Sequence, residues 1–272
     1  SRFLMPPEQF IGHSIEKVLP PYLAKLTAEK ISATLSTGQI QIYHYSLGMG
    51  GEEKFFESRM TLLNQDSLLV LVRDVTDRKR AEEALKASAR RAQLQRNALA
   101  QLTLNESINQ SNLEESLKEI ARIVSDVLNV GRASIWLLSA DNSELKCVML
   151  RQAGQPPRPG QEILNAANYP VYFQALRQES ILSISDTYLD PRTIEFINDY
   201  LPRFGIGALL DVSIQNEGRL TGIICAEHTG GPRAWHPDES LFLRAVANFT
   251  AQLFAQAERK RAEDELRESE KR

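Results

Sequence analysis

Hydrophobic and polar positions in the first quarter of the chain follow the patterns of one helix and three strands. Apolar residues at helical spacing predict an amphipathic helix over residues 22–35, and Thr37-Gly38 is typical of a helix end. Prolines before this helix exclude a long helix there. Alternation then predicts strands over residues 39–47 and 55–63, joined by a glycine-rich hairpin turn over residues 48–53, and a third strand over residues 67–72.

The third strand is apolar on both faces, since residues 68–72 read LLVLV. Such a run is typical of a strand in the middle of a sheet whose two faces are covered. Only two other strands are predicted in this segment, and both precede it. Because an exposed apolar edge invites aggregation, we expect this edge to pair with a neighbouring chain or to be capped by another segment.

A charged helical sequence occurs twice in the chain. It reads RKRAEEAL at residues 78–85 and RKRAEDEL at residues 259–266, directly after two different modules. Both copies consist of strong helix formers with a sparse apolar line. This composition indicates solvated helices that pair along a narrow seam.

The first copy begins a predicted linking helix over residues 76–104 with spacings of three and four residues along one line. The members of this line are Leu85, Ser88, Ala92, Gln95, Leu99 and Leu102. We interpret Leu85, Ala92, Leu99 and Leu102 as the seam of a parallel dimer, weakened by the two polar members. A weak seam suits a switch that changes register or rotates. The alternative is a solvated spacer helix.

The second half of the chain predicts an α+β fold. The polar residues 105–110 break the linking helix, and Ser111 with Glu114 fits a capping box ahead of an amphipathic helix that ends at residues 129–131. Further helices are predicted over residues 169–178 and from His236 onward. The predicted strands cover residues 133–138, 145–152, 180–185, 206–214 and 220–227. This order favours an antiparallel sheet with helices packed on one face.

Composition narrows the function classes. The 272 residues are 42% hydrophobic and 25% charged, which suits two globular domains. A net charge of -3 gives no basic field for nucleic acid, and no apolar run is long enough to insert into a membrane. Cys147 and Cys225 lie in apolar strands, where buried reduced thiols are expected. We find no phosphate-binding loop, catalytic triad or kinase motif, so we expect no catalytic residues and no metal site.

Residues 1–75 resemble the C-terminal part of a PAS sensor domain. The resemblance is carried by EQFIGHSIEKVLP, YHYSL, FFESRM and above all LLVLVRDVTDRKRAEEAL, which is similar to the family's closing signature. It implies a partial PAS domain whose first strands are missing. It also implies that Asp74 and Thr76 relay signals from the core to the output helix. The plain interpretation of both residues is a helix cap, and the two roles are compatible.

Residues 113–255 resemble a GAF domain of multi-domain bacterial sensors, especially cyanobacterial ones. The resemblance is carried by ASIWLLS, YPVYFQAL, ISDTYLDPR and the block from Gly207 through residue 253. Segments that cover the sheet in this family suggest a ligand pocket here. Its candidate residues are Tyr172, Phe173, Asp190, Phe196, Tyr200 and His228. For the aromatic side chains, core packing is the plain alternative, and for His228 it is a buried histidine that is not a ligand.

The resemblance leaves three ligand classes to weigh. A covalent bilin would need a cysteine where residues 190–203 offer neither Cys nor His, so we do not expect one. The residue constellation of cyclic-nucleotide GAF domains is not found. We therefore expect an unknown small molecule, or no cofactor at all.

Together the resemblances imply a cytoplasmic homodimeric fragment of a signalling protein. The expected parts are the partial PAS domain (1–75), the linking helix (76–104), the GAF domain (105–255) and a C-terminal output helix (256–272). The helices would pass signals to downstream domains of the same parent chain, with a sensor histidine kinase as the first choice. The alternatives are a diguanylate cyclase parent or a purely structural dimerisation segment without ligand.

Overall fold

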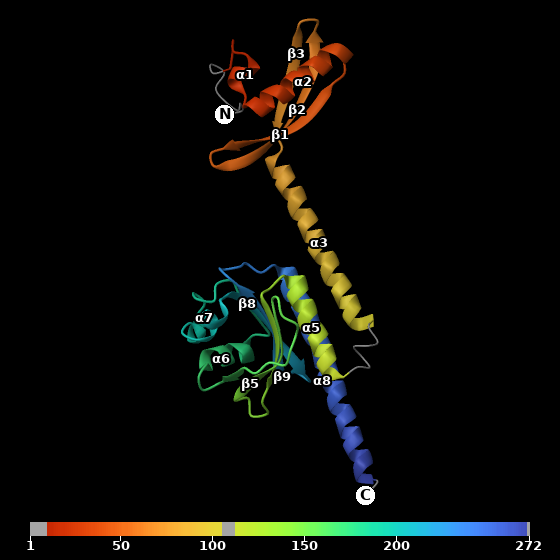
Figure 1. The fold of residues 1–272 in the computed structure, drawn as a ribbon, viewed down its shortest axis with the longest axis vertical. Helices are drawn as coiled ribbons and strands as arrows, with labels where there is room; N and C mark the ends of the chain where they lie inside the picture. Colours follow the sequence, from red (N-terminus) through yellow and green to blue (C-terminus); the bar gives the residue numbers. More distant parts are fainter. Residues whose placement is uncertain (1–9, 105–111, 271–272) are drawn as a thin grey trace. The chain divides into compact units, whose positions relative to one another are not determined.

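The computed structural model describes residues 10–104 and 112–270, and the chain divides into two compact units, Ser1–Ala89 and Arg90–Arg272. Figure 1 shows the elements along the chain. Each unit holds an antiparallel sheet and its own hydrophobic core. The prediction of an α+β chain with two antiparallel-sheet modules is confirmed. Among the described residues, no helix is both long and apolar enough to cross a membrane.

The first unit is a three-stranded sheet with a helix packed on it. Its helices are α1 (Ile15–Val18) and α2 (Pro21–Thr37), and its strands, in the order β1-β2-β3, are β1 (Gln41–Met49), β2 (Glu52–Asn64) and β3 (Ser67–Asp74). Leu23 of α2, Tyr43 and Met60 form the centre of the core. Gly38 ends α2 with a φ of 69°, as the sequence predicts. Leu35, near the end of this helix, is 50% exposed.

Strand β3 lies at an edge of the sheet within this chain. Its apolar residues Leu69, Val70, Leu71 and Val72 are between 41% and 60% exposed. Only β2 pairs with it among the residues that the structure describes. The prediction that another segment of this chain caps the β3 edge is therefore wrong for the residues that the structure describes. Pairing with a neighbouring chain stays a prediction.

Helix α3 (Thr76–Leu104) follows β3 after a single residue. The repeated sequence at its start, residues 78–85, is exposed throughout in this chain. Towards its end the helix joins the core of the second unit, where Leu102 is 1% and Ala98 is 6% exposed, and Leu99 is partly buried. Leu102 therefore packs within its own chain, and its place in a dimer seam stays a prediction. Leu85 is 71% exposed and Ala92 is half-buried.

The second unit is built on a six-stranded antiparallel sheet in the order β6-β5-β4-β9-β8-β7. Strand β6 (Ile163–Asn165) was not predicted from the sequence. The other strands are β4 (Arg132–Leu138), β5 (Glu144–Gln152), β7 (Ile181–Ile184), β8 (Ile206–Asn216) and β9 (Arg219–Thr229). The two central strands β4 and β9 pair with Arg132 opposite Glu227.

Helices cover both faces of this sheet, which corrects the prediction of a single covered face (Figure 1). One face carries the long helices α5 (Leu113–Leu128) and α8 (Pro237–Glu270), whose core includes Ile120, Val124 and Val246. The other face is covered by short elements. These are α6 (Pro170–Gln178), the 3-10 turn η2 (Ile194–Phe196) and α7 (Tyr200–Phe204).

The ends of the long helices follow local chemistry. The cap of α5 is Asn112, whose side chain accepts a hydrogen bond from the Glu114 amide, and not Ser111 as predicted. Ser111 and the predicted helix break at residues 105–110 lie outside the described residues. Helix α8 is buried at Phe242, Val246 and Leu253. Its continuation through the second copy of the repeat, residues 259–266, is exposed throughout.

Candidate functional site

Buried polar side chains of the second unit gather on the sheet face that α6, η2 and α7 cover. They are Arg132 and Ser134 of β4, Asp211 of β8 and Glu227 of β9, each between 1% and 3% exposed. Burying a charge is unfavourable unless it is paired and hydrogen-bonded. Burying this cluster therefore costs desolvation free energy. Buried charged groups of this kind are common at functional sites.

Arg132 and Glu227 form a buried ion pair across the central strands. The Nε of Arg132 donates to Oε2 of Glu227 at 2.8 Å, and the hydroxyl of Tyr200 donates to Oε1 at 2.9 Å. Burial lowers the pKa of Arg132, but the Glu227 carboxylate and the Tyr200 hydroxyl together raise that pKa above its ordinary value. The guanidinium carbon of Arg132 lies 3.9 Å from the centre of the Phe204 ring. Its Nη1 and Nη2 have no hydrogen-bond partner within the described chain.

Asp211 forms the second polar centre on this face. Its Oδ2 accepts a 2.6 Å hydrogen bond from the hydroxyl of Tyr172, and Cys225 lies opposite it on β9. Burial raises the pKa of Asp211 to about 7, against the lowering effect of the Tyr172 and Cys225 side chains. Burial also raises the pKa of Tyr172 and Cys225. The carboxyl of Asp211 therefore titrates near neutral pH while its neighbours stay protonated.

An unbroken series of aromatic rings covers these polar groups. Phe196 lies at its centre, with ring centroids 4.4 Å from Tyr169, 4.9 Å from Tyr172 and 5.5 Å from Tyr200. Phe204 extends the series, 4.9 Å from Tyr200. The rings thus link α6, η2 and α7 into one layer over the sheet.

A pocket of about 530 Å³ opens beside this aromatic layer. Tyr169, Tyr200 and Phe204 form its aromatic wall, and Arg158 and Arg203 bring positive charge to it. The remaining lining residues are Gln161, Glu162, Ile163, Leu164 and Asp199. Because Tyr200 and Phe204 contact Glu227 and Arg132, the pocket and the buried ion pair share a wall.

The structure brings together four of the six predicted pocket residues. Tyr172, Phe173, Phe196 and Tyr200 all belong to the core between the sheet and its short covering elements. Whether they contact a ligand stays a prediction. Each of them also packs in the core, as the plain alternative expects.

The other two predicted pocket residues, Asp190 and His228, interact with other parts of the domain. Both oxygens of Asp190 are bound by the guanidinium of Arg192, at 2.9 and 2.8 Å, and this pairing lowers the pKa of Asp190. His228 follows Glu227 on β9, so its side chain points to the opposite face. Burial and the charge of Arg233 lower its pKa.

Sequence reasoning missed Arg132, Asp211 and Glu227, although the sequence carried a signal for Asp211 and Glu227. Asp211 interrupts the apolar run of β8, and Glu227 ends the apolar run of β9. A charge inside a strand that is apolar on both sides must find a partner or shift its pKa. That rule marks these positions without showing which of them pair.

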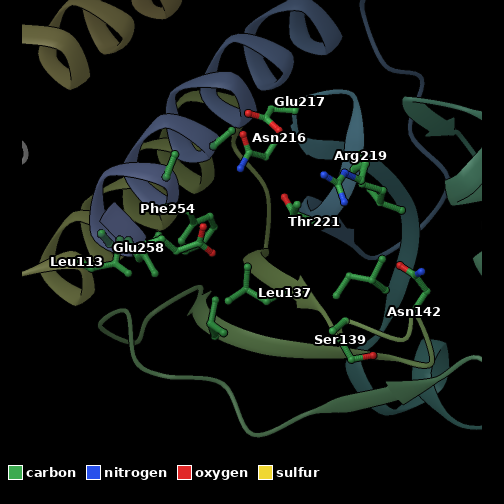
Figure 2. Close-up of a pocket in the computed structure, with 18 of the residues that line it drawn as sticks. Leu113, Leu137, Ser139, Asn142, Asn216, Glu217, Arg219, Thr221, Phe254 and Glu258 are labelled. Carbon is green, nitrogen blue, oxygen red and sulfur yellow. The ribbon is translucent and has the colours of Figure 1, made fainter. Parts of the chain in front are cut away.

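A second and larger hollow, of about 900 Å³, lies where α8 passes the end of the sheet (Figure 2). Leu113 of α5 and Phe254 and Glu258 of α8 line one side. Leu137, Ser139 and Asn142 from β4 and its turn, and Asn216, Glu217, Arg219 and Thr221 from the β8–β9 hairpin, complete much of the lining. None of the predicted pocket residues lines this hollow, and it contains none of the buried unpartnered polar atoms.

Metal-ligand and thiol chemistry find little support in the described part of the chain. No group of three or more His, Cys, Asp or Glu side chains there could hold a metal ion. Cys147 and Cys225 are buried and free, as predicted, and burial raises the pKa of Cys147 to about 12.

In the first unit, Asp74 and Thr76 lie where β3 passes into α3. The side chain of Asp74 accepts a 2.9 Å hydrogen bond from the Thr76 amide, as a helix cap does. This hydrogen bonding to Thr76 lowers the pKa of Asp74. The hydroxyl of Thr76 accepts from the amide of Phe55 on β2 at 2.9 Å. Thr76 therefore ties the first turn of the helix to the central strand.

Two ion pairs reinforce this attachment. Arg78 contacts Glu57 at 3.4 Å, and Arg80 contacts Glu52 at 3.4 Å. Both acidic residues belong to β2. Because these arginines are more than half exposed, each pair alone contributes little to stability.

Comparison with known families assigns both units. A model of the GAF domain matches residues 112–254, and a model of the PAS fold matches residues 1–80. The prediction of a PAS module followed by a GAF module is confirmed. Both are families of sensory domains, and neither match is to a catalytic domain. No curated protein matches the sequence.

Solved GAF domains share the fold of the second unit. The GAF domain of a phosphoenolpyruvate-protein phosphotransferase from Coxiella burnetii is 20% identical with a TM-score of 0.52, covering 63% of this chain and 98% of that one. The corresponding domain from Acinetobacter is 19% identical, with a TM-score of 0.49 and coverages of 60% and 94%. A GAF domain of Synechocystis sp. PCC6803 in its photoproduct state is 21% identical, with a TM-score of 0.45 and coverages of 54% and 96%.

Proposed function

This chain belongs to the GAF domain family, and we propose that it is the sensory region of a signal-transduction protein, in which helices carry a signal from the PAS and GAF modules to an output domain. The signal is the binding of a small molecule or a change of conformation in either module. The chain itself performs no catalysis in this proposal.

One observation carries the proposal. Thr76 and Leu102 stand near the two ends of α3, a single helix of 29 residues. Thr76 is hydrogen-bonded to β2 of the first unit, and Leu102 is buried in the core of the second. Because a helix transmits displacement and rotation along its axis, a change at either core has a continuous path to the other.

Helix α8 likewise begins in the core of the GAF domain and extends beyond it. It packs on the sheet through Leu253 and then continues, fully exposed, through the second copy of the repeat. Leu85 in the first copy is 71% exposed and Leu266 in the second is 61% exposed. These exposed apolar side chains support a homodimer in which both copies of the repeat pair with a second chain.

For the output we propose a histidine kinase of a two-component system, located in the cytoplasm, and a diguanylate cyclase as the alternative. In either case the downstream domains of the parent chain are the partners of α8. The acidic net charge of -3 favours neither nucleic acid nor an anionic membrane surface as a partner.

As the sensing site we propose the pocket beside the aromatic layer of the GAF domain. It lies next to the buried groups Arg132 and Glu227, whose hydrogen bonds run through Tyr200 to the pocket wall. A covalent bilin finds no support, because both thiols are buried and burial raises the pKa of each.

The test joins residues 1–272 through α8, in continuous helical register, to the catalytic core of a histidine kinase. Autophosphorylation is compared for the parent fusion and for the Thr76→Val and Asp74→Ala variants. We expect both variants to change the rate several-fold, because each loosens α3 from the PAS sheet. Asp66→Ala, in the β2–β3 turn, is the matched control and leaves the rate unchanged.

Equal rates in all four fusions contradict the relay and favour a purely structural dimerisation segment. That alternative also expects the molar mass to be dimeric and independent of any small molecule. A relay that responds to Thr76→Val but to no ligand supports conformational signalling from the PAS module alone.

A further inference from the structure

The guanidinium of Arg132 has a free end inside the GAF domain. The side chain is 1% exposed, and its Nε is committed to Glu227. Nη1 and Nη2 make no hydrogen bond to the part of the chain that the structure describes. A buried donor without an acceptor is unfavourable, and more so when it is charged. Arg132 is therefore disposed to bind an additional acceptor.

The geometry of the pair decides which acceptor fits. Glu227 does not fill this role in the structure: its oxygens accept from Nε of Arg132 and from the hydroxyl of Tyr200, and neither bonds to Nη1 or Nη2. The two Nη atoms form the end of a rigid planar fork, which matches the two oxygens of a carboxylate in parallel hydrogen bonds. An acceptor with a single oxygen would bond to only one of the two Nη atoms.

The surroundings of Arg132 define the rest of the ligand. The Phe204 ring lies against the guanidinium at 3.9 Å and also lines the 530 Å³ pocket. Tyr169 and Tyr200 complete an aromatic wall that suits a flat apolar body. On the outside, Arg203 lies 5.0 Å from the same Phe204 ring, and the lining carries Arg158 and Arg203 beside the carboxylates of Glu162 and Asp199.

We propose that this pocket binds a small aromatic carboxylate, whose two oxygens bond to Nη1 and Nη2 of Arg132 once Tyr200 and Phe204 turn aside. The inference rests on the proposed sensory function and names the ligand class of its site. Both moving rings belong to α7, so ligand entry shifts this helix and releases Tyr200 from Glu227. Binding is thereby converted into a rearrangement of the layer that covers the sheet.

The test measures binding of benzoate and of its neutral isostere benzamide to residues 1–272 by calorimetry. Benzoate is expected to bind with at least about tenfold higher affinity than benzamide, because only the carboxylate pairs with the charged fork. Two-dimensional NMR of arginine side chains supplies a second readout. The Nε–Hε and Nη signals of Arg132 shift on addition of benzoate, since the hydrogen bonds form at that group.

Two variants assign the binding to Arg132. The double variant Arg132→Leu/Glu227→Leu replaces the ion pair with apolar side chains of similar size, an exchange that buried pairs tolerate. It is expected to lose the preference for benzoate over benzamide. Arg203→Gln removes an exposed guanidinium near the same ring and is expected to weaken benzoate by less than about threefold. Circular dichroism confirms that both variants are folded.

Three results overturn the inference. They are equal affinity for benzoate and benzamide, unchanged benzoate binding by the double variant, and binding of inorganic phosphate without binding of benzoate. None of these touches the relay, which is tested separately through Thr76 and Asp74. Conversely, benzoate binding that leaves the activity of the fused kinase unchanged supports the proposed ligand class and contradicts a role of the pocket in signalling.

Discussion

The hydroxyl of Tyr172 on α6 donates a 2.6 Å hydrogen bond to the carboxyl of Asp211 on β8. Both residues are almost fully buried, at 3% and 2% exposed. The bond attaches the covering helix to the middle of the sheet through a group that titrates near neutral pH. Stability of the GAF domain should therefore depend on the protonation of Asp211.

The sign of that dependence follows from the raised pKa. Asp211 has a folded-state pKa of about 7 against an ordinary value of 3.8, so the folded state holds its proton more tightly than the unfolded state. Its contribution to stability is complete below the unfolded pKa and is lost as the pH rises through the folded one. Asp211→Asn carries no titrating proton. We expect this variant to gain stability relative to the parent as the pH rises from about 4 to about 7, by at most about 4 kcal/mol.

Urea unfolding followed by tryptophan fluorescence measures this, because the chain's two tryptophans, Trp136 and Trp235, both lie in the second unit. The matched control is Asp141→Asn. Hydrogen bonds from Ser139 and Ser143 lower the pKa of Asp141 to about 2. Its stabilisation is present above the ordinary pKa, so this variant loses a little stability at neutral pH. A pH profile of Asp211→Asn parallel to that of the parent contradicts the assignment.

Thr76→Val should loosen the start of α3 from the PAS sheet. The valine keeps the shape of the side chain but leaves the Phe55 amide without its 2.9 Å acceptor. We expect a loss of about 1–2 kcal/mol in the stability of the first unit. Hydrogen exchange at the Phe55 amide should accelerate accordingly. Thr76→Ser retains the hydroxyl and should restore most of the protection; equal exchange in the valine and serine variants argues against this hydrogen bond.

Periodicity and motif predicted most of the fold but not the pairing of charges. Alternation located β1 and β2, and apolar runs located β4, β5, β8 and β9. Neither could reveal β6, whose three residues are too short for a pattern. The pattern at β3 was read correctly as apolar on both faces, yet its place at the sheet edge depends on which strands are present.

The candidate site was predictable in its aromatic residues and not in its polar ones. Tyr172, Phe196 and Tyr200 were found through the resemblance of the segments that carry them. The pairing of Arg132 with Glu227 joins positions 95 residues apart, and only the register of β4 with β9 brings them together. Local sequence carries no information on that register beyond the apolar character of both strands.

Gly222 tests the packing of the two central strands. A Cβ at this position would run into the backbone carbonyl of Trp136 on β4, which cannot turn away as a side chain can. Gly222→Ala should therefore destabilise the GAF domain by about 1–3 kcal/mol through overpacking. Gly48, on β1 of the PAS module, has open space around its Cβ position and a negative φ, so Gly48→Ala is the control. Urea midpoints that shift equally in the two variants contradict the close approach.

The last prediction separates the two roles of α3. Leu102 is 1% exposed within its own chain, whereas Leu85 is 71% exposed on the same helix. Leu102→Ala should destabilise the GAF domain by about 2–5 kcal/mol, as large-to-small changes in a core do.

Leu85→Ala should leave that stability within about 0.5 kcal/mol, as surface substitutions do. If the exposed copies of the repeat pair with a second chain, Leu85→Ala weakens the dimer and Leu102→Ala does so only through loss of folding. Molar mass by light scattering over a dilution series, read beside the urea midpoints, distinguishes these effects. An unchanged dimer in folded Leu85→Ala places the chain-to-chain contact elsewhere than on this part of α3.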